Sequence, residues 1–428
     1  MPKKETIEHR RQSHLEEVLD FCAALGRSMI LSGANTERVS LAVEHICHVY
    51  ELHDVSVYLL STYISVAGRD SEGRYAARQF SIPAAGIHLE RLKRLNRLSY
   101  TVSSTRPAPE RLGKMLQEAE NARDYADWAV LLGQVSAMMC LAIIFGGTWR
   151  EVLAVAVVTV ILHYVAFLMA KPGLDRIVVN AVTMFIASVS ALALTFFHLS
   201  DNGPVILITV SMLLIPGIPL VNAVRNLLCG HEMNGILQLA KVIVETLALA
   251  MGIFVALSLF IRSADSMSTT AVPLTNPWIL IPVSALASVA FGVVFRIPPH
   301  DLVWAGLGGA LTRVVLILSS AVMPIRLMYV TLAAFVASLY AELMATARKD
   351  PATYFLYPSI VPLIPGDLFF YSLIGVYVQN RQMFETNGSS CLLTLLGMSI
   401  GFVLSSTVAH YIRKARRVKL WKLPLLRK

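Results

Sequence analysis

Residues 214–217 read Leu-Ile-Pro-Gly, and the same four residues recur at 363–366, each time inside a long apolar segment. Proline has no amide hydrogen and its ring clashes with the preceding turn, while glycine adds backbone freedom. We therefore expect a helix break at each motif. A break frees backbone carbonyls and amides, which at membrane depth are tolerated only where protein or a water-filled cavity satisfies them. The two motifs thus predict interior sites.

The composition indicates a membrane protein. Of 428 residues, 55% are hydrophobic and only 15% are charged, whereas an ordinary soluble domain has about 25% charged residues. A single soluble globule, a disordered chain and a disulfide-rich scaffold are excluded. A membrane span needs about 20 mostly apolar residues. Ten segments meet this criterion, at 128–147, 151–170, 177–199, 204–223, 237–261, 277–295, 301–320, 324–345, 355–378 and 391–412.

The first 125 residues have a different character, with 17 Lys/Arg and 16 Asp/Glu in balance. Alternating apolar residues predict strands, and helical spacing predicts helices. The expected organisation is a cytoplasmic α+β domain at 1–125, two five-helix membrane repeats at 126–265 and 266–412, and a basic tail at 413–428. Within the first domain, we expect helices at 12–31, 36–52, 88–100 and 109–124, the last continuing into the first span, and strands at 55–60, 63–67 and 75–80.

The distribution of Lys and Arg predicts the orientation in the membrane. With the N-terminus inside, the internal loops and the tail carry fourteen of these residues, and the external loops carry four. The positive-inside rule then places both termini in the cytoplasm and favours an even number of spans. The tail 413–428 directly follows an apolar helix, so the net charge of +9 indicates contact with lipid and not with nucleic acid.

An internal duplication with an offset of about 150 residues relates the two membrane regions. Glu151 corresponds to Asp301, Phe-Ile-Ala-Ser at 185–188 corresponds to Phe-Val-Ala-Ser at 335–338, and the two Pro-Gly motifs lie 149 positions apart. Five spans per half is an odd number, so the second half is expected to enter the membrane inverted. Inverted repeats are a known plan of secondary transporters, which bind their substrate at the repeat interface. The expected fold is therefore an α-helical polytopic membrane protein of about ten transmembrane helices, arranged as two inverted five-helix repeats.

The matched breaks predict a substrate site formed by both halves. Helix N-termini at the breaks would bind charged groups of the substrate. The expected substrate-binding residues are Pro216, Gly217, Pro219, Asn222, Pro365, Gly366, Asp367 and Tyr371.

Charged residues inside the spans are candidates for proton coupling or charge compensation. A charge at the bilayer centre costs about 2.5 to over 10 kcal/mol, so such groups face a cavity, pair with one another or relay protons. Lys241 and Glu245 lie one helical turn apart and can pair. A structural ion pair or a position at the membrane interface remains an alternative for several members. The candidates are Lys241, Glu245, Arg313, Glu342 and Asp367.

Motifs for other functions are missing from the sequence. It has no Walker loop, no GxGxxG and no GxSxG, so ATP-driven transport and α/β-hydrolase chemistry lack support. His45 and His48 lie on one expected helix without an obvious third ligand, so we predict no metal site and no cofactor. The five cysteines show no paired spacing and are expected to be free thiols.

Three stretches resemble the threonine/serine exporter family. Residues 33–39, Gly-Ala-Asn-Thr-Glu-Arg-Val, resemble its N-terminal signature, residues 215–226 its first membrane half, and residues 362–366 its second. The resemblance implies a bacterial inner-membrane exporter of small polar metabolites that uses the proton gradient. It also implies two modules, separate in some relatives, that are joined here near 265–276. Asn226 stands where the family often has an acidic residue, so a carboxylate role is not expected there.

We therefore expect an alternating-access exporter of threonine/serine-type amino acids, with the substrate, protons and lipid as its partners and without catalytic residues. The split relatives are associated with succinate and similar dicarboxylates, which leaves these substrates as an alternative. A passive channel, a membrane-embedded enzyme that uses the N-terminal domain as a hydrolase, and a metabolite sensor also stay open, as does a homo-oligomer.

Overall fold

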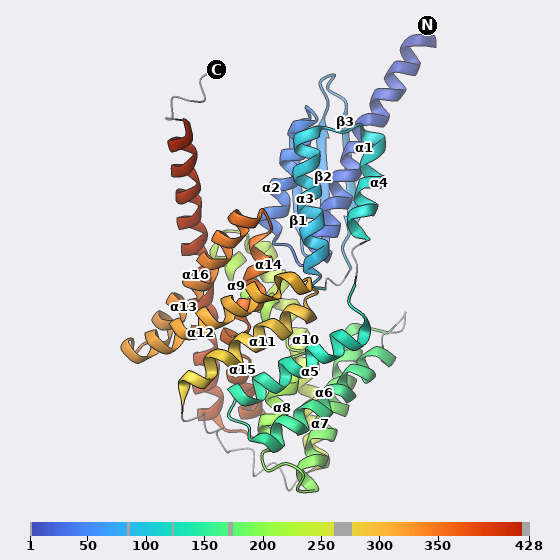
Figure 1. Ribbon diagram of the computed structural model, residues 1–428. Coiled ribbons are helices and arrows are strands. Elements are labelled where there is room, and N and C mark those ends of the chain that lie inside the picture. The colour runs from blue at the N-terminus through green and yellow to red at the C-terminus, as the bar shows by residue number, and fades with distance from the viewer. Residues whose placement is uncertain (1, 84–85, 122–123, 170–173, 261–275, 422–428) are drawn as a thin grey trace. The chain divides into compact units, whose positions relative to one another are not determined.

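The structure, a computed structural model, describes residues 2–83, 86–121, 124–169, 174–260 and 276–421, with side chains between 14 and 412. The chain separates into two units, each described by itself below (Figure 1). Two short segments from the second half of the sequence belong to unit 1. Unit 1 comprises Met1–Tyr125, Phe295–Pro298 and Ala345–Tyr354, and unit 2 comprises Ala126–Val294, Pro299–Met344 and Phe355–Lys428.

Unit 1 contains a three-stranded antiparallel sheet in the order β1-β2-β3, so the expected strands and the α+β character are confirmed. Ile64 and Val66 of the central strand are fully buried. Helices α1 and α2 pack on the sheet, and α3 and α4 pack on those helices (Figure 1). The elements are α1 (Pro2–Leu31), α2 (Thr36–Val49), β1 (His53–Leu60), β2 (Tyr63–Arg69), β3 (Tyr75–Ser81), α3 (Leu89–Thr105) and α4 (Pro109–Glu120).

The expectation that the helix at 109–124 continues into the first span is wrong. α4 ends at Glu120, and residues 124–126 are not helical. Contacts within unit 1 hold this stretch. The carboxylate of Asp124 lies 3.1 Å from Arg296, and the hydroxyl of Tyr125 donates to the carbonyl of Ile297 at 2.6 Å. These long-range contacts override the local helical preference of the sequence.

The beginning of α3 depends on a buried histidine. Nδ1 of His88 accepts the backbone N–H of Arg91 at 3.2 Å, and Nε2 lies 2.8 Å from Asp124. Burial lowers the pKa of His88, and Arg91 and Arg296 lower it further, while Asp124 opposes the shift. The ring must therefore be neutral at Nδ1 to cap the helix.

We predict that unit 1 loses stability in acid through His88. The unfolded chain takes up the proton at the ordinary histidine pKa of about 6.5, before the folded chain does. The contribution is complete above about pH 6.5 and falls as the pH drops below that value. Thermal unfolding of the full-length protein between pH 7.5 and 5.5 should show this decline, and His88→Asn, which keeps a capping acceptor, should flatten it. Parallel curves for the two proteins would exclude His88 as the cause.

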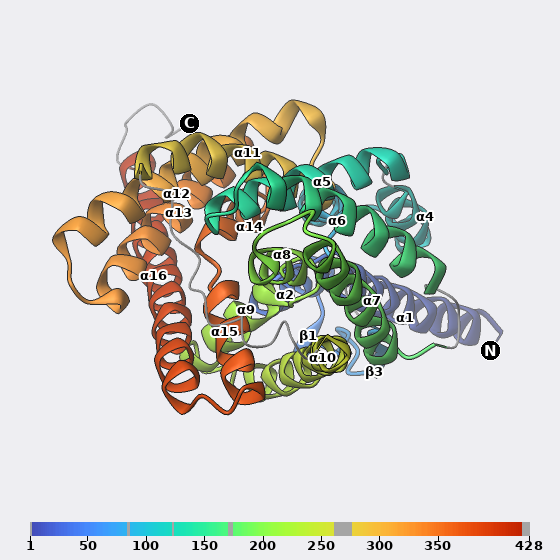
Figure 2. The same ribbon diagram turned by 90° about the horizontal axis from the view of Figure 1, so that it is seen from below.

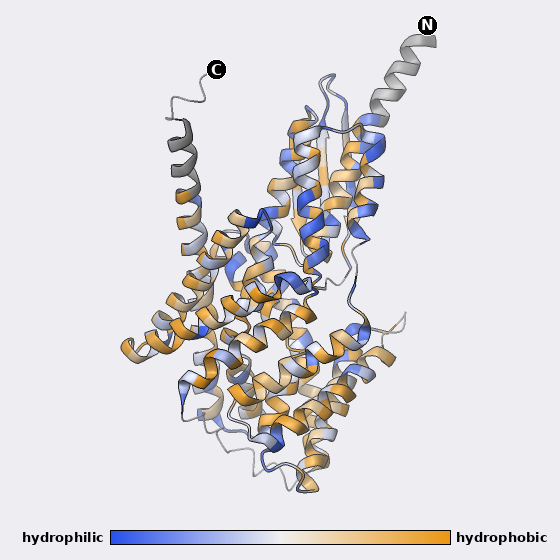
Figure 3. Cartoon of the chain, in the orientation of Figure 1, coloured by the Kyte–Doolittle hydropathy of each residue, from blue (hydrophilic) through white to orange (hydrophobic). Residues whose placement is uncertain are grey.

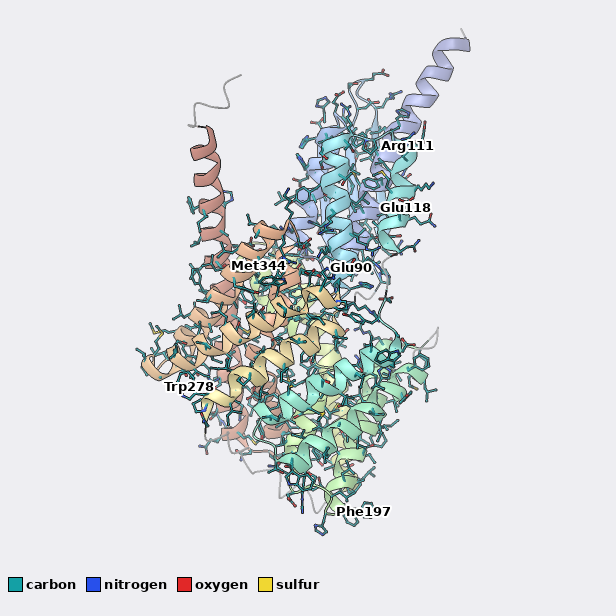
Figure 4. All side chains as sticks on the ribbon, in the orientation of Figure 1. Glu90, Arg111, Glu118, Phe197, Trp278 and Met344 are labelled. Carbon is teal, nitrogen blue, oxygen red and sulfur yellow. The ribbon has the colours of Figure 1, made fainter. Side chains whose placement is uncertain are left out.

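Unit 2 is built of long apolar helices with lipid-facing character, which appear orange in Figure 3. In the described part of the chain, eight helices are long and apolar enough to cross a membrane. Aromatic side chains such as Phe197 and Trp278 project from helix ends (Figure 4), as is typical of membrane interfaces. The eight are α5 (Asp127–Ile144), α6 (Trp149–Met169), α7 (Arg176–Phe196), α10 (Glu232–Leu259), η3 (Pro277–Ile279) with α11 (Leu280–Val294), η4 (Pro299–Asp301) with α12 (Leu302–Val322), α13 (Arg326–Arg348) and α16 (Arg381–Trp421).

Two broken helix pairs complete the unit, so the expected ten spans become eight, or nine if the second pair counts as one. α14 (Ala352–Ile360) with η5 (Val361–Leu363) is bent by 49° against α15 (Gly366–Tyr377). The segment expected at 204–223 forms α8 (Gly203–Ser211) and α9 (Gly217–Leu228). Each of these two helices alone, at about 14 and 18 Å, is too short to cross a bilayer core of about 30 Å, whereas the two together are long enough.

The first helix of each broken pair lies in the interior. Every residue of α8 and of α14 is buried, whereas the spans of α5, α6 and α7 are only 28–33% buried. Figure 2 shows α8 and α9 inside the ring of long helices. The long helices therefore supply the surface toward lipid, and the broken helices are shielded from it, as freed backbone groups require.

One packing contact occurs in both halves at corresponding positions. A Cβ on Gly252 in α10 would meet the carbonyl of Ala181 and lie 2.9 Å from the amide of Phe185. A Cβ on Gly401 in α16 would lie 2.6 Å from the carbonyl of Thr331 and 2.8 Å from the amide of Phe335. The glycines are 149 positions apart, and their partners are 150 positions apart. Each half also has three long helices, a broken pair and a further long helix in the same order, which supports the predicted repeat, while its inversion stays a prediction.

Candidate functional site

The two helix breaks have the same backbone geometry. Pro216 has φ −77° and ψ 61°, and Pro365 has φ −82° and ψ 55°. In each break, the amide of the following glycine donates to the carbonyl two residues earlier, Gly217 to Ile215 at 2.8 Å and Gly366 to Ile364 at 2.9 Å. These are inverse γ-turns centred on proline. The turns end one helix and start the next, as the Pro-Gly motifs predict.

The breaks lie against each other in unit 2. A Cβ on Gly217 would be 2.6 Å from Cγ2 of Ile364, which belongs to the second break. A Cβ on Gly366 would meet Sδ of Met212, which follows α8 at the first break. Each glycine thus makes room for a side chain of the opposite break. The structure brings Pro216, Gly217, Pro365 and Gly366 together, and the N-termini of α9 and α15 begin at this point.

Side chains from other helices satisfy carbonyls that the second break frees. Arg313 of α12 is 8% exposed. Its guanidinium donates to Oγ of Ser284 at 2.8 Å and to the carbonyl of Pro362 at 3.3 Å. The thiol of Cys391 in α16 contacts the carbonyl of Pro365 at 3.9 Å. Arg313, which the sequence marks as a buried charge, is therefore attached to the broken helix itself.

Asp367 lies in the first turn of α15, directly after the break. Here the positive end of the helix dipole favours its carboxylate. No direct ion pair joins this carboxyl group to Arg313 among the residues that the structure describes. One carboxyl side chain and one guanidinium side chain thus flank the second break.

The first break contributes polar groups from α9. Nδ2 of Asn222 donates to the hydroxyl of Tyr357 in α14 at 3.2 Å, which links the two broken pairs. Pro219 lies in the first turn of α9, next to the break. The hydroxyl of Tyr371 is buried, and its ring packs edge-to-face on Phe370 in α15. Asn222 therefore joins the two broken pairs, whereas Pro219 and Tyr371 lie within their own helices.

The remaining charged candidates lie on other helices. In the described chain, no ion pair joins Lys241 and Glu245, and their roles in coupling stay predictions. Lys241 is exposed, whereas Glu245 is 9% exposed. Glu342 is half-buried in α13. Arg313 and Asp367 are the charged candidates that lie at the second break.

Sequence reasoning missed four residues of this region: Met212, Ser284, Tyr357 and Cys391. Met212 and Cys391 contact the second break directly, whereas Ser284 binds the guanidinium of Arg313 and Tyr357 binds Asn222. Ser284 and Cys391 lie in ordinary apolar segments, so no local signal marks them. Tyr357 precedes Pro358 shortly before the second motif, and this polar aromatic residue could have been noticed. Within the described residues, no group of three His, Cys, Asp or Glu could hold a metal ion.

Comparison with known proteins identifies the family. A threonine/serine exporter family model matches residues 20–260, which is more than half of the chain, and a second threonine/serine exporter model matches residues 281–408. The chain belongs to the threonine/serine exporter family. The matched ranges include both breaks, and the resemblance seen in the sequence is thereby confirmed. No solved structure was found to match.

Three curated proteins resemble this exporter at 24–28% identity. A Mycobacterium tuberculosis protein named "Probable threonine/serine exporter" is 24% identical over 419 residues, covering 94% of this chain and 78% of that protein. Proteins named "Probable succinate transporter subunit YjjP" match 32% of this chain. The Klebsiella aerogenes protein is 24% identical over 53% of its length, and the Escherichia coli protein is 28% identical over 54% of its length. As a family member, the chain is a multi-pass membrane exporter of a small molecule and not an enzyme.

Proposed function

We propose that this exporter moves a small zwitterionic amino acid of the threonine/serine type out of the cell in exchange for protons. We also propose a bacterial inner-membrane location with both termini in the cytoplasm. The observation that carries the proposal is the meeting of the two Pro-Gly breaks, with Arg313 and Asp367 beside the second. Matched breaks between the halves of a transporter are typical substrate sites.

The charges at the breaks complement a zwitterion. The N-termini of α9 and α15 carry partial positive charge, and Arg313 adds a full one, so this region suits the carboxylate of an amino acid. Asp367 supplies the negative charge that suits the ammonium group. In the interior of a membrane protein, each of these charges needs a partner, and a bound zwitterion provides both.

Competition at Asp367 would couple export to the proton gradient. The ionised carboxylate binds the substrate's ammonium group, whereas the protonated carboxyl loses that attraction. A proton that arrives from the external side therefore favours release of the amino acid, and loss of the proton to the cytoplasm restores binding. Substrate and proton bind alternately, which is the requirement for exchange. Lys241, Glu245 and Glu342 stay secondary candidates for coupling, because they lie on α10 and α13 and not on a broken helix pair.

Succinate-like dicarboxylates are the second candidate class, favoured by the similarity of 137 residues to the two proteins named as succinate transporter subunits. A dicarboxylate has no ammonium group, and its second carboxylate would face Asp367. The ionised aspartate therefore favours an amino acid, and a neutral one would admit a dicarboxylate.

Flux measurements on the purified exporter in liposomes test the proposal. Vesicles are loaded in turn with threonine, serine and succinate, with and without an imposed pH gradient and with an uncoupler. We expect threonine and serine to leave these vesicles faster than they leave loaded vesicles without protein. This efflux should depend on the pH gradient and should stop when the uncoupler is added. Flux of succinate without flux of threonine or serine would show that the substrates are dicarboxylates. Efflux that does not depend on the pH gradient would indicate a channel.

A further inference from the structure

Asp350 is a buried acid outside the candidate site. It lies between α13 and α14 and is 4% exposed. Within unit 1, its carboxylate lies 3.1 Å from Nζ of Lys93 and 3.2 Å from the guanidinium of Arg97, both on α3. The ammonium of Lys93 also lies 4.8 Å from the ring centre of Tyr354 in α14. A cation of the N-terminal region is thus buried between an acid and an aromatic ring of the α13–α14 connection.

The Lys93–Asp350 pair lies at the start of the helix that leads to the second break. Asp350 immediately precedes Pro351 and α14, all of whose residues are buried. The chain then runs through η5 directly into the Pro365 turn. Burying two charges is costly unless their geometry is well fixed. A fixed Lys93–Asp350 pair therefore fixes the start of the broken helix.

Unit 1 also holds the connection that leads into α12, the helix of Arg313. The amide of Leu89 donates to the carbonyl of Phe295 at 2.9 Å, and Tyr125 donates to Ile297. Both connections of unit 1 with the second membrane half thus enter elements that carry the second break or its arginine.

In the first membrane half, the corresponding connection, which leads into α8, is held by a residue of that half. The carboxylate of Glu151 accepts hydrogen bonds from Oγ of Ser200 at 2.9 Å and from the amides of Asp201 and Asn202 at 3.0 and 3.1 Å. These residues immediately precede α8. Asp201 and Asp350 are 149 positions apart, the offset of the two breaks. The membrane half itself restrains one broken pair, and the N-terminal region restrains the other.

We propose that Lys93 and Asp350 are positioning residues through which the N-terminal domain sets the entry of α14 and thereby the second break. The pair touches no substrate. It holds α14 in place for the transport cycle, and its loss loosens the second broken pair without loosening the first. The N-terminal domain therefore contributes to transport by positioning α14.

Hydrogen–deuterium exchange on the full-length protein in detergent tests this directly. In Lys93→Met, we expect amides of 352–366 to exchange at least about tenfold faster, while amides of α8 keep their wild-type rates. Lys93→Arg, which keeps the cation, should restore slow exchange. Glu51→Gln is the matched control, because it removes an exposed ion pair of unit 1, with Arg106 at 2.7 Å, that lies apart from this connection. Unchanged exchange in Lys93→Met would overturn the proposal.

A double variant separates positioning from the cost of an unbalanced charge. Lys93→Met with Asp350→Asn removes both charges, so no buried carboxylate loses its main partner. We expect exchange in 352–366 to stay fast, as in the single variant, with a normal unfolding temperature. A return to wild-type exchange would show that the charge imbalance alone caused the effect and would contradict positioning.

Transport by the same variants adds a second readout that rests on the proposed function. In liposomes, Lys93→Met should lower the maximal rate of threonine efflux several-fold and leave its KM near the wild-type value, because the pair lies outside the site. A raised KM with an unchanged maximal rate would contradict a positioning role. Should the wild-type protein carry no threonine, the proposed function fails, and the exchange experiment still decides this inference.

Discussion

Replacing Asp367 with asparagine is expected to abolish efflux driven by the pH gradient while the exporter still folds and inserts. Asparagine has nearly the same shape as aspartate but can neither take up a proton nor carry the charge that binds an ammonium group. Asp367 lies in the first turn of α15, beside the break. Without it, proton and substrate have no shared binding group.

The measurement is threonine efflux from liposomes at several pH gradients. Vesicles with Asp367→Asn should release threonine no faster than loaded vesicles without protein. Threonine binding by this variant should be weak and independent of pH. In the wild-type protein, binding should weaken as the pH falls. Asp201→Asn is the control, because this aspartate is exposed and pairs with Arg150 at 3.2 Å, away from the breaks. Gradient-driven efflux by Asp367→Asn at the wild-type rate would remove this residue from the mechanism.

Alanine at Gly252 or at Gly401 is expected to destabilise unit 2 by similar amounts. In both places, the new methyl group would meet a backbone carbonyl and a backbone amide of the neighbouring helix, and these cannot rotate away as a side chain can. Overpacking of this kind costs about 1–3 kcal/mol, and more where the backbone must shift. The helix pairs affected are α7 with α10 and α13 with α16.

Thermal unfolding of the purified variants in detergent measures both effects. Gly113→Ala is the control, since Gly113 lies within α4 with nothing within 4 Å of an added Cβ. That change should stabilise its helix by about 0.5–1 kcal/mol. A large loss at one of the two membrane glycines with none at the other would argue against equivalent packing in the two halves.

Local chemistry explains what the sequence predicted well. The Pro-Gly motifs identify both breaks, because the missing amide of Pro216 and Pro365 acts on the helix in which it lies. The strands of unit 1 follow from alternation, and in the turn between β2 and β3 the carboxylate of Asp70 accepts the amides of Glu72 and Arg74 at 3.0 Å. Each of these features needs only neighbouring residues.

Tertiary contacts explain what the sequence did not predict. Asp350 lies more than 250 positions from Lys93, and no periodicity relates the two. Lys241 and Glu245 satisfy the spacing for a helical pair, yet one side chain is exposed and the other is buried. The segment 204–223 has the length and hydropathy of a span, but its break divides it into two short helices. The predicted join of the two modules near 265–276 falls almost entirely outside the described residues.

The side of the membrane on which each broken pair begins tests the central claim most directly. Single cysteines are placed at Asp201, before α8, and at Ala347, before α14, after replacement of the five native cysteines, and both positions are exposed. A membrane-impermeant maleimide is then added to sealed right-side-out and inside-out vesicles. Two inverted halves predict that Asp201→Cys reacts only in right-side-out vesicles and Ala347→Cys only in inside-out vesicles. Labelling of both positions from the same side would contradict the inverted repeat and the substrate site built on it.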